Sequence, residues 1–324
     1  MGEVGGVSVT GEVQGETRLG EEYAQHRPLL FSIAYRMTGT VSDAEDIVQE
    51  AFTRLARALR SGTAVTEPKA YLATAATRLA LNHLRSARLR RESYLGTWLP
   101  EPVFTGPGPE EHAEMADSLS MAFLVVLESL SPAERAVFLL HEVFGYEHKE
   151  IAEITATSVA NSRQVLARAR RHVDEGKPRF EASRAQREEV ARRFFAAAGG
   201  GDLDGLLRAL APDAVYYGDG GGKARALAAP MHGRERIARF LAGLFRQIQK
   251  REARIRFVEV NGQPGAASYD GDRVVNVFAL DVADGVVQAV RCVVNPDKLR
   301  HLGRVSKLAT KPPDQDAPAP FPRP

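Results

Sequence analysis

The feature that most constrains the fold is a pair of amphipathic segments joined by a short polar turn, between residues 131 and 173. Ser131, Pro132 and Glu134 form a capping box with proline at the first helical position, so a helix is expected to begin there. A second short helix is expected over 149–154. After the turn at 155–158, small or apolar residues recur three and four positions apart, which predicts one buried stripe on a third helix. The stripe comprises Val159, Ser162, Leu166, Ala169 and Val173.

The remaining positions of this third helix are expected to face outward. They are Ala160, Asn161, Arg163, Gln164, Ala167, Arg168, Arg170 and Arg171. Arginine pairs with guanine and asparagine or glutamine with adenine in the major groove, so a helix–turn–helix that presents these side chains suits DNA reading. An ordinary three-helix bundle with a solvated basic face is the alternative, and these residues alone leave it open.

The charge of the whole chain adds little to this interpretation. The 324 residues carry a formal net charge of only +2, so affinity for nucleic acid must come from local patches. Two such patches occur, at 78–91 and 163–179, and basic runs of this kind can neutralise several phosphates. A solvated helix face is again the alternative.

Cysteine content and hydropathy indicate the compartment. A single cysteine, Cys292, excludes an intramolecular disulfide and fits a reducing cytoplasm. Its valine neighbours predict a buried structural thiol and not a nucleophile. No apolar run reaches the roughly 18 residues that a membrane span needs, and the first twenty residues lack a signal-peptide core. We expect a soluble, cytoplasmic protein with no membrane partner.

The order of elements predicts several domains. Residues 1–22 read as a disordered leader, 23–92 as a helical bundle, and 117–178 as the helix–turn–helix domain. Between them, 93–116 contains prolines and glycines that forbid a long helix, and also the only tryptophan, Trp98. Exposed aromatic surface is unfavourable, so this linker is expected to dock on another part of the protein.

Taken together, these segments resemble a bacterial RNA polymerase sigma factor of the extracytoplasmic-function group. Residues 43–59 look like the region 2 helix that meets the clamp helices of core RNA polymerase, 69–92 like the part that engages the −10 element, and 131–173 like region 4, which reads the −35 element. The resemblance implies polymerase-binding residues Asp46, Gln49, Glu50 and Arg54. It implies −10 residues Arg78, Asn82, Arg85 and Arg88, and −35 residues Arg163, Gln164, Arg168, Arg170 and Arg171.

The C-terminal part has a different pattern. Residues 183–249 read as helical, and 254–260, 273–280 and 286–295 read as antiparallel strands separated by glycine-containing turns. Helices followed by a curved antiparallel sheet suggest an α+β cone, which resembles the SnoaL-like domain. We therefore predict a multidomain chain: all-α region 2 and region 4 domains, then a SnoaL-like domain over 182–308 and a disordered tail at 309–324.

Three short motifs narrow the resemblance to sigma factors with a fused SnoaL-like domain. The motif residues are Trp98, Leu99, Pro100, Glu101 and Pro102; Asp219, Gly220, Gly221, Gly222 and Lys223; and Asn295, Pro296, Asp297, Lys298 and Leu299. We hypothesise that the Asp219–Lys223 loop meets Trp98–Pro102 and fixes the spacing of the two DNA-reading modules. Through the resemblance, the C-terminal domain is expected to modulate sigma activity.

Two other functions remain open from the residues. One is a stand-alone helix–turn–helix regulator, and the other is a SnoaL-like enzyme or ligand-binding domain with a DNA-binding appendage. The candidate polar groups of a cone cavity, which could hold a small ligand, are Tyr216, Tyr217, Asp219, His232 and Asp270. No pair has a diagnostic catalytic spacing, and the lysine of the glycine loop lacks the following Ser or Thr of a phosphate-binding loop. We expect no catalysis, cofactor or metal.

Overall fold

The computed structural model describes the chain except residues 1–8, 93, 107–117, 177–181 and 308–324, together with the side chains of 9–18, 87–92 and 175–176. The predicted leader and tail lie partly or wholly in these excluded segments. The chain divides into two compact units. Unit 1 comprises residues 1–92 and 123–177, and unit 2 comprises 93–122 and 178–324.

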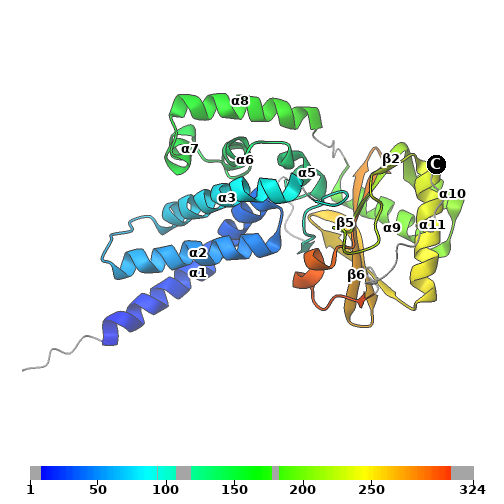
Figure 1. The fold of residues 1–324 in the computed structure, drawn as a ribbon, viewed down its shortest axis with the longest axis horizontal. Coiled ribbons are helices and arrows are strands. Elements are labelled where there is room, and N and C mark those ends of the chain that lie inside the picture. The colour runs from blue at the N-terminus through cyan, green and yellow to red at the C-terminus, as the bar shows by residue number, and fades with distance from the viewer. Residues whose placement is uncertain (1–8, 93, 107–117, 177–181, 308–324) are drawn as a thin grey trace, which may run out of the picture. The chain divides into compact units, whose positions relative to one another are not determined.

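Unit 1 begins with a three-helix bundle, formed by α1 (Val9–Thr38), α2 (Val41–Arg60) and α3 (Pro68–Glu92) (Figure 1). All three helices pack against one another. Gly39 ends α1 with a positive φ of 72°, which glycine adopts without steric cost. Residues 9–22, predicted as part of a disordered leader, instead belong to α1. Extending an existing helix needs no new nucleus, so a polar segment can continue a helix that tertiary packing has already formed.

The second part of unit 1 is the helix–turn–helix region. It contains α5 (Met121–Glu128), α6 (Pro132–Phe138), a π-helical turn η2 (Leu139–Val143), α7 (His148–Thr155) and α8 (Val159–Gly176). The capping box at Ser131 and Glu134 is present. In α8 the predicted stripe is buried from Ser162 to Val173, while Val159 is half-buried. The sequence prediction of this element is therefore confirmed.

Unit 2 is built on a sheet with the strand order β1-β4-β5-β6-β7-β2-β3. Its strands are β1 (Phe104–Thr105), β2 (Leu210–Asp219), β3 (Met231–His232), β4 (Arg254–Val260), β5 (Gln263–Asp270), β6 (Arg273–Ala283) and β7 (Val286–Val293). The helices are α9 (Arg184–Gly200), α10 (Leu203–Ala209), α11 (Arg234–Lys250) and the 3-10 helix η3 (Pro296–Leu302). Helices α9, α10 and α11 share one hydrophobic core with one face of the sheet.

The alternation of residues assigns the two faces of this sheet. Tyr216 pairs with Val290 on the face that joins the hydrophobic core, whereas the next pair, Tyr217 and Arg291, lies on the opposite face. Asp219 has the same parity as Tyr217 and lies on that opposite face at the end of β2. The register of β2 thus separates residues that the sequence places side by side.

The predicted fold class is confirmed, with two corrections. The sheet is mixed, because β2 pairs with β7 in parallel. Residues 183–249 are not all helical, since β2 and β3 interrupt them. The parallel partner of β2 lies some seventy residues further along the chain, where no local pattern could reveal it. The run 263–270, which we did not predict as a strand, forms β5 between β4 and β6.

Candidate nucleic-acid interface and linker site

The recognition-like surface of α8 is held by local caps. Ala156 ends α7 in the left-handed conformation, with φ at 53°. The Ser158 hydroxyl then accepts a hydrogen bond from the Asn161 backbone N–H at 3.1 Å, and the Asn161 side chain donates to the Thr157 hydroxyl at 2.7 Å. These bonds satisfy the start of α8 and fix the turn before it. Asn161 is therefore engaged in the turn itself.

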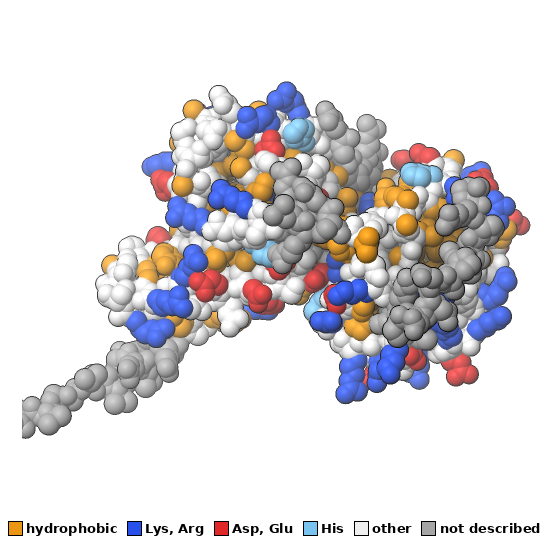
Figure 2. All heavy atoms as spheres, in the orientation of Figure 1, with side chains coloured by type: hydrophobic (Ala, Val, Ile, Leu, Met, Phe, Trp, Pro, Cys, Tyr) orange, Lys and Arg blue, Asp and Glu red, His pale blue; other side chains and the backbone are white. Residues whose placement is uncertain are grey.

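All five predicted −35 residues are exposed on α8: Arg163, Gln164, Arg168, Arg170 and Arg171. Figure 2 shows Lys and Arg side chains along the part of unit 1 that α8 occupies in Figure 1. Two of the arginines have acidic neighbours: Arg170 pairs with Glu142 at 2.7 Å, and Arg168 lies 3.6 Å from Glu134. The row as a whole presents the donors that groove reading requires.

The predicted −10 residues are in a different position. Asn82 and Arg85 are exposed on α3, and the side chain of Arg88 lies outside the described residues. Arg78 reaches from α3 to the end of α7, where it donates to the carbonyls of Ile154 and Glu153 at 2.9 and 2.8 Å. Carbonyls at a helix C-terminus lack intrahelical donors and carry the negative end of the helix dipole, so a guanidinium satisfies both needs.

A second arginine makes a contact in the opposite direction, from the helix–turn–helix region to the three-helix bundle. Arg135 of α6 is buried and donates to the Met37 carbonyl, at the end of α1, at 2.6 Å, and to Glu128 at 2.7 Å. Burial lowers the pKa of Arg135 to about 10, so the group stays charged near neutral pH. The three-helix bundle and the helix–turn–helix region are therefore held together by arginines exchanged in both directions.

The predicted polymerase-binding residues lie on one side of α2. Asp46, Gln49 and Arg54 are exposed and Glu50 is half-buried. Glu50 and Arg54 form an i,i+4 ion pair at 2.9 Å. The buried residues of the same helix face α1 and α3, which leaves this polar side toward solvent.

Within unit 2, the linker docks on the buried carboxylate of Asp219, which is 0% exposed. Tyr94 donates its hydroxyl to one oxygen at 2.5 Å. The Leu99 backbone N–H donates to the other oxygen at 2.8 Å, and the Lys298 ammonium lies 2.7 Å from that oxygen. The structure thus brings one residue from each of the three predicted motifs together around a single carboxylate.

Lys298 provides the opposite charge of this cluster. Its ammonium also donates to the Leu99 carbonyl and lies 4.8 and 4.4 Å from the ring centroids of Tyr94 and Trp98. A desolvated cation between two aromatic faces gains cation–π stabilisation. Burial, followed by the adjacent Asp219 charge, raises the pKa of Tyr94, so its hydroxyl remains a donor at neutral pH. Every polar group in the cluster therefore has a partner of suitable character.

The glycine loop lets the third motif approach closely. Gly221 has φ at 55°, and a β-carbon there would overlap the Asn295 side-chain amide. That amide donates to the Tyr94 hydroxyl at 2.9 Å, while the Asn295 backbone N–H donates to the Asp219 carbonyl at 2.9 Å. Lys223 pairs with Asp297 at the exposed edge. The close approach of Asn295 therefore requires glycine at position 221.

Several linker contacts were not predicted. Phe104 and Thr105 form β1, which extends the sheet beside Val260 and Glu259 of β4. The buried Asn261 exchanges hydrogen bonds with the Val103 backbone, at 2.8 and 2.9 Å, and its amide also donates to the Leu119 carbonyl at 3.1 Å. His301 donates to the Pro102 carbonyl at 2.7 Å. Asn261 precedes Gly262 in one of the glycine-containing turns between predicted strands, and nothing in the local sequence signals a contact with the linker.

The five candidate groups for a cone cavity do not converge. Tyr216 lies in the core beside Cys292, Tyr217 packs under Arg291 on the opposite face, and Asp219 holds the linker. Asp270 accepts a hydrogen bond from Ser306 at 2.7 Å. His232 is exposed on β3.

Cys292 offers a test of these assignments. The thiol is buried, and burial raises its pKa to about 12. Because the thiolate is the reactive form and the sulfur is buried, modification by a disulfide reagent should stay slow from pH 7 to 9 in the native chain. In denaturant it should become fast and rise with pH. Rapid native modification would contradict the buried thiol.

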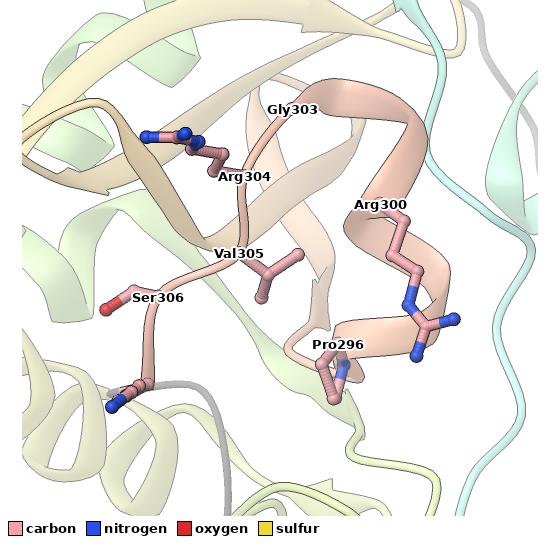
Figure 3. Close-up of a pocket in the computed structure, with 7 residues that line it drawn as sticks. Pro296, Arg300, Gly303, Arg304, Val305 and Ser306 are labelled. Carbon is pink, nitrogen blue, oxygen red and sulfur yellow. The ribbon is translucent and has the colours of Figure 1, made fainter.

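A separate concavity of about 380 Å³ lies beside η3 and the segment that follows it. Figure 3 shows Arg300 of η3 and Arg304 of the segment that follows it, with the Val305 side chain extending from this segment toward the helix. Arg300 pairs with Asp297 at 2.7 Å. Helix η3 contributes residues both to this pocket and to the linker site. The residues that surround the Asp219 carboxylate do not line the pocket.

In the part of the chain that the structure describes, no helix combines the length and apolar character of a membrane span. Nor do the His, Cys, Asp and Glu side chains of this part gather in any group of three or more that could hold a metal ion.

Comparison with known families matches three segments of the chain. Residues 23–90 match Sigma-70 region 2, 120–173 match Sigma-70 region 4, and 191–294 match the SnoaL-like domain.

Relatives that align with most of the chain are sigma factors as well. The ECF RNA polymerase sigma factor SigJ of Mycobacterium tuberculosis is 39% identical over 293 residues, which cover 86% of this chain and 92% of SigJ. A probable ECF sigma factor SigI of the same species is 32% identical and covers 85% and 92%. The SigJ crystal structure superposes with a TM-score of 0.69 at 37% identity, covering 86% of this chain and 98% of that one. The chain belongs to the extracytoplasmic-function RNA polymerase sigma factors and carries a C-terminal SnoaL-like domain.

Proposed function

We propose that this sigma factor reads the −35 element with the exposed row of α8 and the −10 element with α3, while the polar side of α2 meets the clamp helices of core polymerase. The observation that carries the proposal is the α8 surface, where five exposed arginine and glutamine side chains lie on a helix fixed by caps at its start. The acidic start and exposed polar side of α2 support the polymerase contact.

The proposal includes a closed and an open state of unit 1. The −10 and −35 elements are centred roughly 25 base pairs apart, which is about 85 Å of duplex at 3.4 Å per base pair. A compact unit of this size is only about 40 Å across. The conformation in which Arg78 and Arg135 join the two modules therefore suits a free, closed form, and promoter binding requires that these contacts break.

The docked linker gives the SnoaL-like domain a role in this change. Because the linker connects the two reading modules, anchoring it at Asp219 and Asn261 shortens the segment that is free to extend. We propose that the domain modulates activity by setting how far apart the modules can move. A ligand in unit 2 that stabilised or weakened the docked linker would then modulate transcription.

The test is run-off transcription with core polymerase on promoter fragments selected by the holoenzyme. The full chain should give promoter-specific transcripts. Arg163→Ala is expected to weaken −35 binding about 5- to 150-fold, the range that one lost bidentate base contact produces. Arg193→Ala, an exposed arginine of α9 outside the helix–turn–helix, is the control and should leave it unchanged. Equal transcription from both variants would contradict the assignment of α8, and the absence of any core-dependent transcript would contradict the sigma function.

A further inference from the structure

Helix α11 of unit 2, yellow in Figure 1, has a buried side and an exposed side of opposite character. The buried side consists of Ile237, Ala238, Leu241, Ala242, Phe245 and Ile248. On the exposed side, positions 236, 239, 243, 246 and 250 follow at intervals of three and four, so they form one line along the helix. Four of them are exposed cations and the fifth is glycine, and we call this line the α11 basic face: Arg236, Arg239, Gly243, Arg246 and Lys250.

The α11 basic face has little acidic compensation. The helix contains five basic residues against one acidic residue, Glu235. Glu235 pairs with Arg234 at 3.3 Å, and it also attracts Arg239 one turn further along. In the part of the chain that the structure describes, none of the four cations of the face forms an ion pair. The face therefore keeps its positive charge.

This arrangement does not stabilise the helix that carries it. Arg234 and Arg236 lie in the first turn of α11, where the positive end of the helix dipole favours acidic side chains. Like charges three or four positions apart, as at 236 and 239 and at 246 and 250, repel each other. Salt screens this repulsion, but only a negatively charged partner converts the face into a source of attraction. The face is therefore better suited to binding than to folding.

The dimensions of the face fit duplex DNA. From position 236 to position 250 the helix rises about 21 Å, at 1.5 Å per residue. This length corresponds to about six base pairs at 3.4 Å per base pair, and every step places a phosphate on each strand. Guanidinium and ammonium groups bind phosphate oxygens without reading a base. Such a surface binds DNA of any sequence, with an affinity that falls as the salt concentration rises.

We infer that the α11 basic face binds the phosphate backbone of duplex DNA, independently of sequence. Its role in the promoter complex rests on the proposed function, because the modules of unit 1 bring the duplex to the chain. Non-specific contacts have a Kd on the order of 10⁻⁴–10⁻⁶ M. Attachment to a module that is already bound gives an effective concentration on the order of 1 mM, so a contact this weak is occupied. The SnoaL-like domain thus adds affinity for duplex outside the −10 and −35 elements.

The first test measures binding of the full chain, without polymerase, to a fluorescent duplex that lacks promoter elements. Anisotropy titrations between about 50 and 200 mM salt give the slope of log K against log salt concentration. Arg236→Gln combined with Arg246→Gln should reduce the magnitude of this slope by about 2, since each phosphate contact contributes about 0.9.

The matched control is Arg225→Gln combined with Arg273→Gln, which removes the same charge from two exposed arginines outside α11. The slope of this control should stay close to that of the native chain. An equal reduction in both double variants would show attraction by net charge alone and would overturn the inference. An unchanged slope in the α11 variant would overturn it as well.

The second test identifies the partner in the complex of polymerase with a promoter fragment that extends beyond both elements. Gly243→Cys carries a photoreactive label in the middle of the face, where a β-carbon meets nothing within 4 Å. The buried Cys292 stays unlabelled. The label should crosslink to DNA, whereas the same label at Arg225→Cys, the control, should not.

The outcomes separate this inference from the proposed function. Crosslinks from position 243 to a polymerase subunit in place of DNA, or no crosslink in a complex that yields promoter-specific transcript, would contradict the inference alone. The absence of any core-dependent transcript from the native chain would contradict the sigma function, while the salt slope would still test the α11 basic face.

Discussion

Replacing Asp219 by asparagine is expected to release the linker from unit 2 and to destabilise the docked state by about 3–5 kcal/mol, because the change leaves the buried Lys298 ammonium without its counter-charge. Asparagine has nearly the same shape, so the effect reports charge and not a cavity. Trp98 is the only tryptophan of the chain and lies against Lys298, so its fluorescence reports on this site alone. Its accessibility to a soluble quencher should rise clearly in Asp219→Asn.

Two companion variants identify the cause. Asp297→Asn removes the exposed pairs with Lys223 and Arg300 and should change stability by no more than about 1 kcal/mol. The double variant Asp219→Asn, Lys298→Met removes both buried charges and should recover much of the loss. Slow modification of Cys292 in each variant verifies that the core is intact. A Trp98 that is as protected in Asp219→Asn as in the native chain would refute the role of this carboxylate.

The same variant tests the spacing role. If the docked linker limits how far the modules separate, promoters whose −10 and −35 elements are one or two base pairs further apart should be poor templates for the native chain. Asp219→Asn should use them nearly as well as the preferred spacing. An identical spacing preference in both proteins would show that linker docking does not set the distance.

Opening of unit 1 is the second large effect that we expect. Donor and acceptor dyes on Ser86→Cys in α3 and Asp174→Cys in α8, both exposed positions, should give efficient energy transfer in the free chain. Binding of core polymerase and promoter should reduce it strongly, because the labels move from within a unit of about 40 Å to helices on elements about 85 Å apart. The buried Cys292 should not be labelled, so no native residue needs replacement.

The control for this experiment carries both labels within one module, at Ser86→Cys and an exposed position of α2 such as Arg57→Cys. Its energy transfer should be unchanged on complex formation. If the first pair also kept its efficiency in a complex that produces transcript, the contacts of Arg78 and Arg135 would have to persist during promoter binding, and the closed state would not exist as we propose.

The sequence predicted those parts of the fold whose signals are local. The capping box at Ser131 and the stripe of α8 lie within a few helical turns, and β4 was predicted with its observed ends because turns flank it. The parallel strand β2 was missed because its partner β7 is distant, and β1 because its two residues are strands only in the presence of β4.

The candidate site shows the same limit. The tryptophan in the linker predicted that the linker docks on another part of the protein. The three motifs led to the hypothesis that the glycine loop meets the linker. The roles of Tyr94, Asn261 and His301 depend on register and could not be read from their neighbours. Arg78 shows the limit most clearly, since an arginine on a basic helix gives no sign that it caps a helix 75 residues away.

The linker contacts also have a consequence for synthesis on the ribosome. Tyr94 and Leu99 bond to Asn295 and Lys298, about 200 positions later, so the docking surface is completed long after the linker has been synthesised. Both DNA-reading modules are complete by residue 177. At roughly 5–20 residues per second, the stretch from residue 178 to Lys298 takes on the order of 10 s to appear. During that interval each new molecule has two folded DNA-reading modules joined by a linker that is not yet anchored. A chain terminated before the docking surface is made would keep its linker unanchored.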